Sequence, residues 1–485
     1  MTDGTAPVPF DDPVSASKPA PIQTQKLVNA AAPLLDPADP LAIARQFVAE
    51  QYTVALTPTL HCWRNDFRRW RGGAHREVGE AALRAELYAY LEHAERPDKN
   101  GKPTPFKPKN HKVSEVMDAL RAATFLDEGI DPPAWLEQFP DAPDPAKLLP
   151  VANGVLNLDA GNLEPHRPEL FVTTALPVSV DPPAPAPAEW LAFLKDLWPD
   201  DTEARDALQE IFGYTLTTDT AQQKIFLMVG PRRSGKGTIA RVLTGLLGRD
   251  NVANPTFASL TSHFGLAPLI DKRLAIISDA RLSGRSDQAA LAERLLSISG
   301  EDGQTIDRKF RDPWNGRLQT RFVIMTNELP RISDSSGAMA SRFILLTLTQ
   351  SFLGKEDLGL TGRLLTELPG IMNWSLVGLR RLRERGHFKQ PESSAEAITA
   401  LEDLASPIGA FVRDCCIVQA GAEVPCDDIF SAWKIWCEDQ GRTRPGTRHT
   451  FGRDLRAAIP GMKITQHRSD GDRRRYYEGV GVVAP

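Results

Sequence analysis

The chain has 485 residues, of which 41% are hydrophobic and 25% charged, as in folded proteins with room for about three domains. Its net charge of −5 at pH 7 excludes a uniformly basic nucleic-acid coat, so contact with nucleic acid must use local basic patches. The five cysteines lack the spacing of a zinc site, and we expect reduced thiols. No apolar run is long enough for a signal peptide or a membrane span, so we expect a cytoplasmic protein without a membrane partner.

The first 185 residues divide into a lead and a domain. Residues 1–40 are rich in Pro, Ala, Asp and Thr without periodicity, which predicts a disordered lead. Residues 41–185 predict a mixed α/β domain, with helical patterns at 78–93 and 112–126 and an extended run at 60–65. This region lacks the metal-ligand spacing of primase chemistry, so we expect a separate primase to make any primers. The proline-rich segment 181–188 predicts an extended linker at its end.

Residues 186–390 carry the patterns of an α/β core. Apolar residues recur at helical spacing over 190–198 and 204–212, which predicts two amphipathic helices. Spacing alone leaves open whether these helices pack into a core or form an oligomerisation collar. A buried strand at 224–229 then leads into a glycine-rich turn, and a helical pattern follows at 238–247.

The glycine-rich turn has the spacing of a nucleotide-binding P-loop. Four residues separate its two glycines, so backbone N–H groups can turn towards phosphate oxygens, and Lys236 can reach the β and γ phosphates of ATP. Thr238 stands one residue beyond the usual Mg²⁺-ligating position, which Gly237 occupies. The alternative is a glycine-rich turn between a strand and a helix. The predicted ATP-binding residues are Gly230, Pro231, Arg232, Arg233, Ser234, Gly235, Lys236, Gly237 and Thr238.

Three further strand patterns end or begin at candidate catalytic residues. The run 273–279 ends in Asp279, which we predict beside Mg²⁺ and the attacking water, although an Asp there is often a turn residue. The run 321–327 ends in Asn327, which can hold the lytic water or simply start a turn. Arg342 precedes a strand at 344–348, where an arginine finger or an ordinary surface arginine could stand. The predicted catalytic residues are Lys236, Asp279, Asn327 and Arg342, and the predicted metal ligands are Thr238 and Asp279.

Two basic regions are candidates for DNA contact. Arg308, Lys309 and Phe310 lie between strand-like segments, where they could meet a phosphate backbone or form a solvated loop. Residues 442–475 contain nine Arg and one Lys against three Asp. This positive charge either contacts DNA or keeps the surface soluble. Helices at 429–440 and 447–459 and strands at 463–467 and 473–477 predict a winged-helix-like domain over 391–485. Its predicted DNA-binding residues are Arg448, Arg453, Arg456, Arg473, Arg474 and Arg475.

The order of these features resembles the superfamily 3 helicases, and within them the phage and plasmid primase-helicase family related to the poxvirus primase-helicase. The resemblance covers most of the chain. The chain departs from the family where Ser278 precedes Asp279 and Ala280 follows, since many members have two adjacent acids there, and at Gly237. The resemblance rests on 153–159, 166–168, 189–217, 230–238, Asp279, 303–311, Asn327 and Arg342.

The family implies an α/β fold with an AAA+-like P-loop ATPase core of the superfamily 3 helicase type. It also implies a homo-hexameric ring that translocates on DNA with ATP bound between subunits. In that ring Arg342 acts in trans, Asn327 is the sensor, and Lys309 with Phe310 sits on a hairpin in the central channel.

The sequence therefore predicts an ATP-dependent DNA helicase of a phage, plasmid or prophage replication system, with single-stranded DNA and origin duplex as partners. One alternative is a DNA-binding initiator or remodelling ATPase without processive unwinding. A small-molecule kinase would also use the P-loop, but it explains neither the placement of Arg342 nor the basic C-terminal region.

Overall fold

The structure, a computed structural model, forms two compact units. The first comprises Met1–Thr53 and Val78–Phe125, and the second comprises Val54–Glu77 and Leu126–Pro485. The predicted boundaries near residues 40, 185 and 390 stay predictions, and the predicted lead falls mostly outside the described residues. The residues that the structure describes are 32–137, 139–181, 184–278, 286–330, 332, 338–442, 445–469 and 472–483.

The first unit is a small helical body. Asp39 caps its first helix by accepting a hydrogen bond from the amide of Ala42, and Pro40 suits the first helical position. The helices predicted at 78–93 and 112–126 are confirmed within a few residues, because their apolar residues recur on one buried face. The elements of this unit are α1 (Pro40–Gln51), α2 (Glu80–Glu92), α3 (Asn110–Ala123), β6 (Glu95–Pro97) and β7 (Pro103–Pro105).

The second unit begins with an antiparallel sheet in which β3 (Leu60–Trp63), β4 (Asp66–Arg71) and β5 (Ala74–Glu77) are neighbours. Arg64 and Asn65, with φ of 51° and 63°, connect β3 to β4 in the two-residue turn that suits twisted strands. The extended run predicted at 60–65 is confirmed over β3. Short strands elsewhere in the chain are β1 (Thr53–Val54), β2 (Thr57–Pro58), β8 (Phe125–Leu126), β9 (Ala134–Trp135), β10 (Leu148–Val151), β11 (Gly154–Asn157), β12 (Leu163–Glu164) and β13 (Leu170–Phe171).

A five-stranded parallel sheet forms the centre of the second unit, in the order β15-β16-β19-β14-β20. Its strands are almost entirely buried, as expected for a parallel sheet covered on both faces. The strands predicted at 224–229, 273–279, 321–327 and 344–348 are confirmed within one or two residues. They are β14 (Ile225–Val229), β16 (Leu274–Ser278), β19 (Arg321–Thr326) and β20 (Phe343–Thr347), and β15 (Val252–Ala253) completes the sheet.

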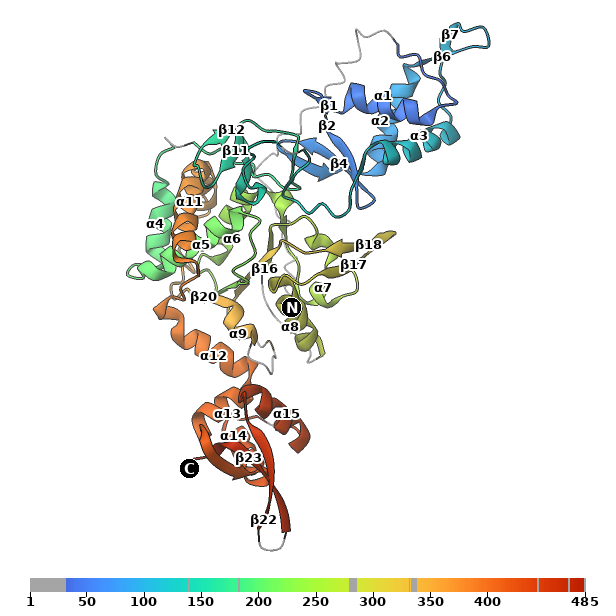
Figure 1. Cartoon of the computed structure of the whole chain (residues 1–485). Coiled ribbons are helices and arrows are strands. Elements are labelled where there is room, and N and C mark those ends of the chain that lie inside the picture. Colours follow the sequence, from blue (N-terminus) through green and yellow to red (C-terminus); the bar gives the residue numbers. More distant parts are fainter. Residues whose placement is uncertain are drawn as a thin grey trace, which may run out of the picture. The chain divides into compact units, whose positions relative to one another are not determined.

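Side chains of successive sheet residues enter two different cores. Phe226 and Met228 join the core with α4, α5, α6 and α11, whereas Ile225 and Leu227 join the core with α7 and α8. In Figure 1 the first four helices and the other two lie on opposite sides of β16. The two helices predicted before the glycine-rich turn, α4 and α5, thus pack into the first core. The helices are α4 (Ala188–Leu197), α5 (Thr202–Leu216), α6 (Lys236–Leu247), α7 (Phe257–Thr261), α8 (Ser286–Ser299), α9 (Ala338–Arg342), α10 (Leu360–Thr366) and α11 (Leu368–Arg385), with short 3-10 turns at η2 (Pro145–Lys147), η3 (Arg249–Asn251), η4 (Ala267–Leu269) and η5 (Glu392–Ser394).

Gly378 of α11 lets this helix approach α5 closely, since a Cβ there would lie 2.3 Å from the carbonyl oxygen of Gln209. We expect Gly378→Ala to lower the free energy of unfolding by about 1–3 kcal/mol, because the two helix backbones must separate. Thermal unfolding of the full chain measures the loss. Gly362→Ala on α10 is the matched control, because nothing lies within 4 Å of its added Cβ; equal losses in the two variants would contradict the prediction.

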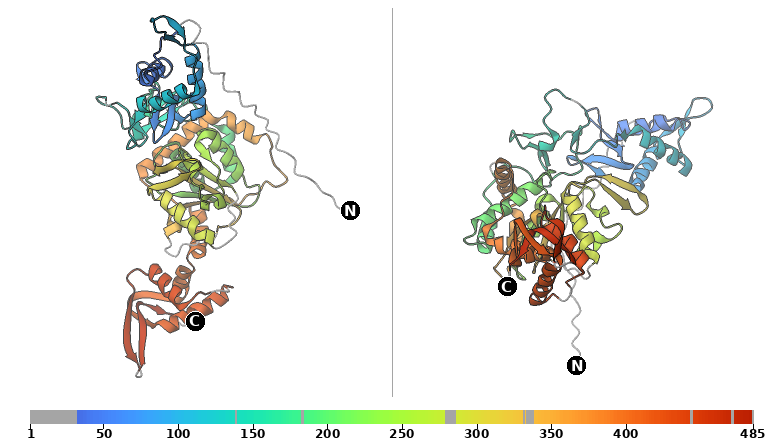
Figure 2. Two further views of the ribbon diagram at one scale, coloured as in Figure 1. Left: turned by 90° about the vertical axis from the view of Figure 1, so that its right-hand side faces the viewer. Right: turned by 60° about the horizontal axis from the view of Figure 1, so that its bottom comes forward.

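The C-terminal part combines four helices with a three-stranded antiparallel sheet in the order β21-β23-β22. The helices and strands predicted between 429 and 477 are confirmed, while β21 was not predicted. The end of the β22–β23 hairpin extends beyond β21 (Figure 2), because β21 pairs with β23 only from Tyr476 to Val482. The elements are α12 (Ala395–Ala405), α13 (Pro407–Cys415), β21 (Cys416–Pro425), α14 (Cys426–Asp439), α15 (Arg448–Ala458), β22 (Lys463–Ser469) and β23 (Asp472–Val482).

In the part of the chain that the structure describes, no helix combines the length and the hydrophobicity needed to cross a bilayer.

Candidate functional site

The glycine-rich turn connects β14 to α6 at the carboxyl edge of the parallel sheet. Gly235 has a φ of 86°, and a Cβ there would lie 2.8 Å from the Leu197 side chain. A Cβ at Gly230 would lie 2.4 Å from the carbonyl oxygen of Leu348. The fold itself therefore requires glycine at both positions, so the spacing has a structural reason beside the predicted phosphate contact.

Lys236 is the first residue of α6, and its ammonium lies inside the turn. Its Nζ donates to the carbonyl oxygens of Gly230 at 2.6 Å and Pro231 at 2.8 Å, and to Ser234 Oγ at 3.0 Å. Burial lowers the pKa of this ammonium. Because the first turn of a helix also leaves backbone N–H groups without helical partners, an anion in the turn would meet several donors at one place.

Thr238, a predicted metal ligand, lies one residue beyond Gly237 on α6. Its Oγ1 accepts a hydrogen bond from Nη2 of Arg241 at 3.1 Å. Arg241 also approaches Gly237, whose added Cβ would lie 3.4 Å from its Nη1. Arg241 was not predicted from the sequence, although its position three residues after Thr238 places both on one helix face. A guanidinium here can bind a phosphate directly.

The side chains of Arg232 and Arg233 point away from the buried end of the turn, since both residues are exposed. Arg233 forms an ion pair with Glu356, with Nε 3.4 Å from Oε1. Its carbonyl accepts from the Phe352 amide at 2.9 Å, and the carbonyl of Arg232 accepts from Ser351 Oγ at 2.9 Å. The segment after β20 therefore holds the turn in place.

The structure brings Asn327 next to the turn. Thr326 at the end of β19 pairs with Val229 at the end of β14, and the Gly230 amide donates to the Thr326 carbonyl at 3.3 Å. Asn327 follows directly and is exposed. The neighbouring strand β16 ends at Ser278, and the predicted acid Asp279 lies outside the described residues.

Arg342 lies at the amino ends of the parallel strands, opposite the glycine-rich turn. It precedes β20, whose first residue Phe343 pairs with Ile225 at the start of β14. The length of β14, about 13 Å at the usual rise per residue, therefore separates it from the turn of its own chain. Its Nη1 donates to Gln223 Oε1 at 2.6 Å.

The predicted hairpin is confirmed, with β17 (Gln304–Arg308) and β18 (Arg311–Gly316) joined by Lys309 and Phe310. Phe310 is 94% exposed, and Lys309 Nζ lies 5.0 Å from its ring centre. Arg308 instead forms an ion pair with Asp66, and its side chain is only 9% exposed. Of the three predicted DNA contacts, two thus form the exposed tip and Arg308 lies in the stem.

The six arginines predicted to bind DNA in the C-terminal part differ in their surroundings. On α15, Arg448 forms an ion pair with Asp427, Arg453 pairs with Asp454 at 2.7 Å, and Arg456 Nε donates to the Gly452 carbonyl at 3.0 Å. The arginines of β23 are exposed and point alternately to the two faces of the hairpin. All six arginines are exposed, and Arg473, Arg474 and Arg475 place three exposed cations in succession on the hairpin.

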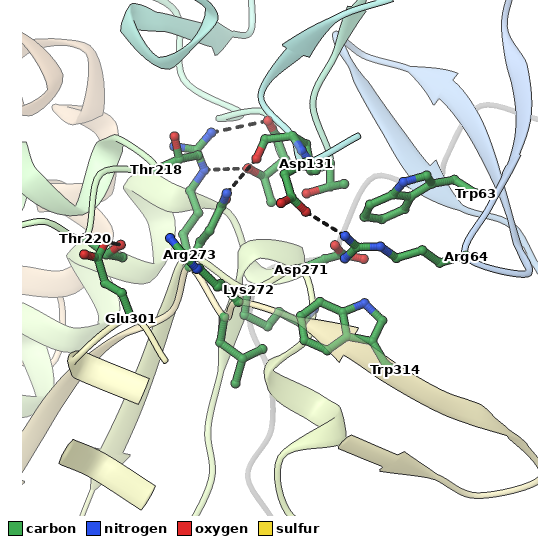
Figure 3. Close-up of a pocket in the computed structure, with 16 residues that line it drawn as sticks. Trp63, Arg64, Asp131, Thr218, Thr220, Asp271, Lys272, Arg273, Glu301 and Trp314 are labelled. Atoms are coloured by element: carbon green, nitrogen blue, oxygen red, sulfur yellow. Dashed lines mark hydrogen bonds and ion pairs between the residues drawn. The ribbon is translucent and has the colours of Figure 1, made fainter. Parts of the chain in front are cut away.

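A polar cavity of about 230 Å³ lies at the amino ends of β16 and β19, at the sheet edge opposite the glycine-rich turn (Figure 3). Arg273 is fully buried there, and it donates to Thr174 Oγ1 at 2.7 Å and to the Leu216 carbonyl. Burial lowers the pKa of its guanidinium to about 9. No sequence motif indicated this cavity, whose charged and aromatic lining includes Trp63, Arg64, Asp131, Asp271, Lys272, Arg273, Glu301, Trp314 and Arg317.

Comparison with known proteins adds two family matches. A family described as D5 N terminal like matches residues 44–199, and a family of unknown function (DUF5906) matches residues 228–342. Replication protein E1 of European elk papillomavirus is 43% identical over 61 residues, which make up 13% of this chain and 10% of that protein.

Among solved structures, the fold is similar to apo forms of the C-terminal region of NrS-1. One has a TM-score of 0.51 and 13% identity, and covers 91% of this chain and 100% of that chain. Another has a TM-score of 0.53 and 13% identity, with 91% and 99% covered. The chain is therefore a mixed α/β protein with a fold similar to that of the NrS-1 C-terminal region. The resemblance to the phage and viral primase-helicase family, predicted from the sequence, is confirmed.

Proposed function

We propose that the chain is an ATP-dependent DNA helicase of a phage, plasmid or prophage replication system that unwinds DNA as a ring-shaped oligomer. One observation carries the proposal. The glycine-rich turn and Asn327 lie at the carboxyl ends of the parallel strands, and Arg342 lies at their amino ends. A site with both Lys236 and an arginine finger therefore needs two copies of the chain, as in a ring with ATP between subunits.

The proposed core is an AAA+-like P-loop ATPase of the superfamily 3 type, with the turn after β14 as its P-loop. The donors of the turn fit the phosphates of ATP. Lys236 donates hydrogen bonds to three oxygen atoms of the turn, and phosphate oxygens can take the place of these acceptors. Bound ATP with Mg²⁺ supplies the phosphoryl group whose transfer to water releases free energy. Thr238 and Asp279 would hold Mg²⁺, and Asn327 would orient the water.

Two surfaces support DNA as the partner. The tip formed by Lys309 and Phe310 offers a cation and an aromatic face, a combination suited to single strands. The C-terminal part offers two helices followed by an arginine-bearing hairpin, and we assign it as a winged helix for origin duplex. In this proposal the chain acts in the cytoplasm as a hexamer, and a separate primase supplies primers.

Strand displacement from a forked duplex, measured with ATP hydrolysis in the presence and absence of single-stranded DNA, tests the proposal. We expect DNA to stimulate hydrolysis and hydrolysis to drive displacement. Stimulation without displacement would favour the initiator or remodelling ATPase. Hydrolysis that ignores DNA would overturn the helicase and favour a P-loop enzyme with a small-molecule substrate.

Arg475 on the proposed wing is expected to contact a DNA phosphate. Arg475→Ala should therefore weaken duplex binding to a similar extent for all DNA sequences. The slope of log K against the logarithm of the salt concentration should become less steep by about 1. Fluorescence anisotropy of the full chain with a labelled duplex, at several salt concentrations, measures both quantities. Lys434→Ala removes an exposed cation of α14 as a control, and an equal change in this variant would contradict a specific role for the hairpin.

A further inference from the structure

The β17–β18 hairpin cannot be stable through its own pairing alone. Within the described residues it forms a separate two-stranded sheet, and such hairpins are marginally stable in water. Its tip is also strained, because Phe310 has a φ of 61°, a conformation that costs a bulky residue free energy unless its surroundings impose it. Contacts from outside the hairpin must therefore hold it.

Ile306 and Trp314 anchor the hairpin in the core that includes α7 and α8. Further polar contacts come from the β3–β4 hairpin, more than 200 residues away in the sequence. The carboxylate of Asp66 forms an ion pair with Arg308 and lies 3.5 Å from Arg311 Nη1. The Asp66 side chain is 11% exposed and that of Arg308 is 9% exposed, so water screens this pair little. Asn65 Nδ2 donates to Asp312 Oδ2 at 3.3 Å, which adds a contact on the same stem.

A second contact fixes the base of the hairpin. The guanidinium of Arg64 lies 4.3 Å from the ring centre of Trp63 and 5.6 Å from that of Trp314 in β18. Figure 3 shows this side chain directed between the two indoles towards Asp131, whose Oδ1 is 2.6 Å from its Nη2. Cation–π attraction thus joins Trp314 to the turn that also carries Asn65 and precedes Asp66.

We propose that the β3–β4 hairpin is a brace that fixes the direction of the β17–β18 hairpin, and that Asp66 is its main positioning residue. Asp66 pairs with Arg308 and lies 3.5 Å from Arg311 Nη1, which also pairs with Glu77 of β5 at 2.6 Å. Both arginines that flank the tip are therefore held, and Lys309 and Phe310 project from a fixed stem. The role of this tip in DNA binding rests on the proposed function. The brace belongs to the region that the D5-like family matches and the hairpin to the second matched family, so Asp66 connects the two regions.

Hydrogen exchange of the full chain without DNA or nucleotide tests the brace directly. In Asp66→Asn, which keeps the size of the side chain, we expect amides of 304–316 to exchange about tenfold faster, while those of β14 and β19 keep their native rates. Basal ATP hydrolysis should stay native, and the DNA concentration for half-maximal stimulation should rise about tenfold. Asp118→Asn, an exposed acid on α3, is the matched control.

The outcomes separate the brace from the proposed function. Native exchange of 304–316 in Asp66→Asn would overturn the brace, whatever happens to hydrolysis. Faster exchange with unchanged DNA stimulation would overturn the positioning role of Asp66. If native protein shows no DNA stimulation, the proposed function fails, and exchange alone still decides the brace. Arg308→Gln should reproduce the exchange of Asp66→Asn, since either change removes the same ion pair, and native exchange in this variant would also contradict the brace.

Discussion

Lys236→Ala is expected to reduce ATP hydrolysis by about 10²–10³-fold, the usual effect of removing one group that stabilises transition-state charge. The Lys236 ammonium lies inside the turn, where it donates to three oxygen atoms. An alanine at this position removes the cation that would stabilise the negative charge developing on the phosphates. Steady-state hydrolysis at saturating DNA measures the loss. Binding of a fluorescent ATP analogue should weaken in parallel, because the lysine also contacts the bound phosphates.

The control must remove a lysine without touching the turn. Lys195 on α4 is exposed, so Lys195→Ala should retain native hydrolysis. Because Lys236 also holds the turn together, thermal unfolding of Lys236→Ala must be compared with that of the native chain. A folded Lys236→Ala protein with native hydrolysis would show that the turn is not the P-loop of the active enzyme.

The sequence predicted the central sheet well because each parallel strand is an apolar run that ends at a polar or glycine residue. Gly230 after β14 and Asn327 after β19 mark two such ends, and pairing of the strands places them together. The strand β21 was missed because most of its residues are exposed and its sequence includes Gln, Gly, Ala and Glu, which lack the alternation of a half-buried strand.

Arg308 shows why the candidate DNA contacts could be predicted only in part. Locally, Arg308 belongs to a basic run with an aromatic residue, which indicates a phosphate contact. Its partner Asp66 stands 242 positions earlier in the chain, and no local spacing reports a pairing at that separation. Arg273 was missed for the same reason, because the segments that it joins meet only in the folded chain.

Arg342→Ala is expected to reduce hydrolysis by about 10³-fold, as for other arginine fingers. The action in trans is tested when Arg342→Ala and Lys236→Ala proteins are mixed. At an interface where the first protein supplies Lys236 and the second supplies Arg342, the site is complete, so hydrolysis should recover partly. The recovery follows from the sheet, because the length of β14, about 13 Å, separates Arg342 from the turn that carries Lys236 in the same chain.

Gln223→Ala separates this action in trans from a structural role within the chain. Arg342 donates to Gln223 Oε1 at 2.6 Å, so the Gln223 variant removes the same hydrogen bond and keeps the guanidinium. We expect Gln223→Ala alone to retain most of the native hydrolysis. When it is mixed with Lys236→Ala, hydrolysis should not exceed the amount that Gln223→Ala contributes by itself. Equal losses in Gln223→Ala and Arg342→Ala, with no recovery on mixing, would show that Arg342 acts inside its own subunit. The complete site would then not need a second copy of the chain, and the ring proposal would lose its main support.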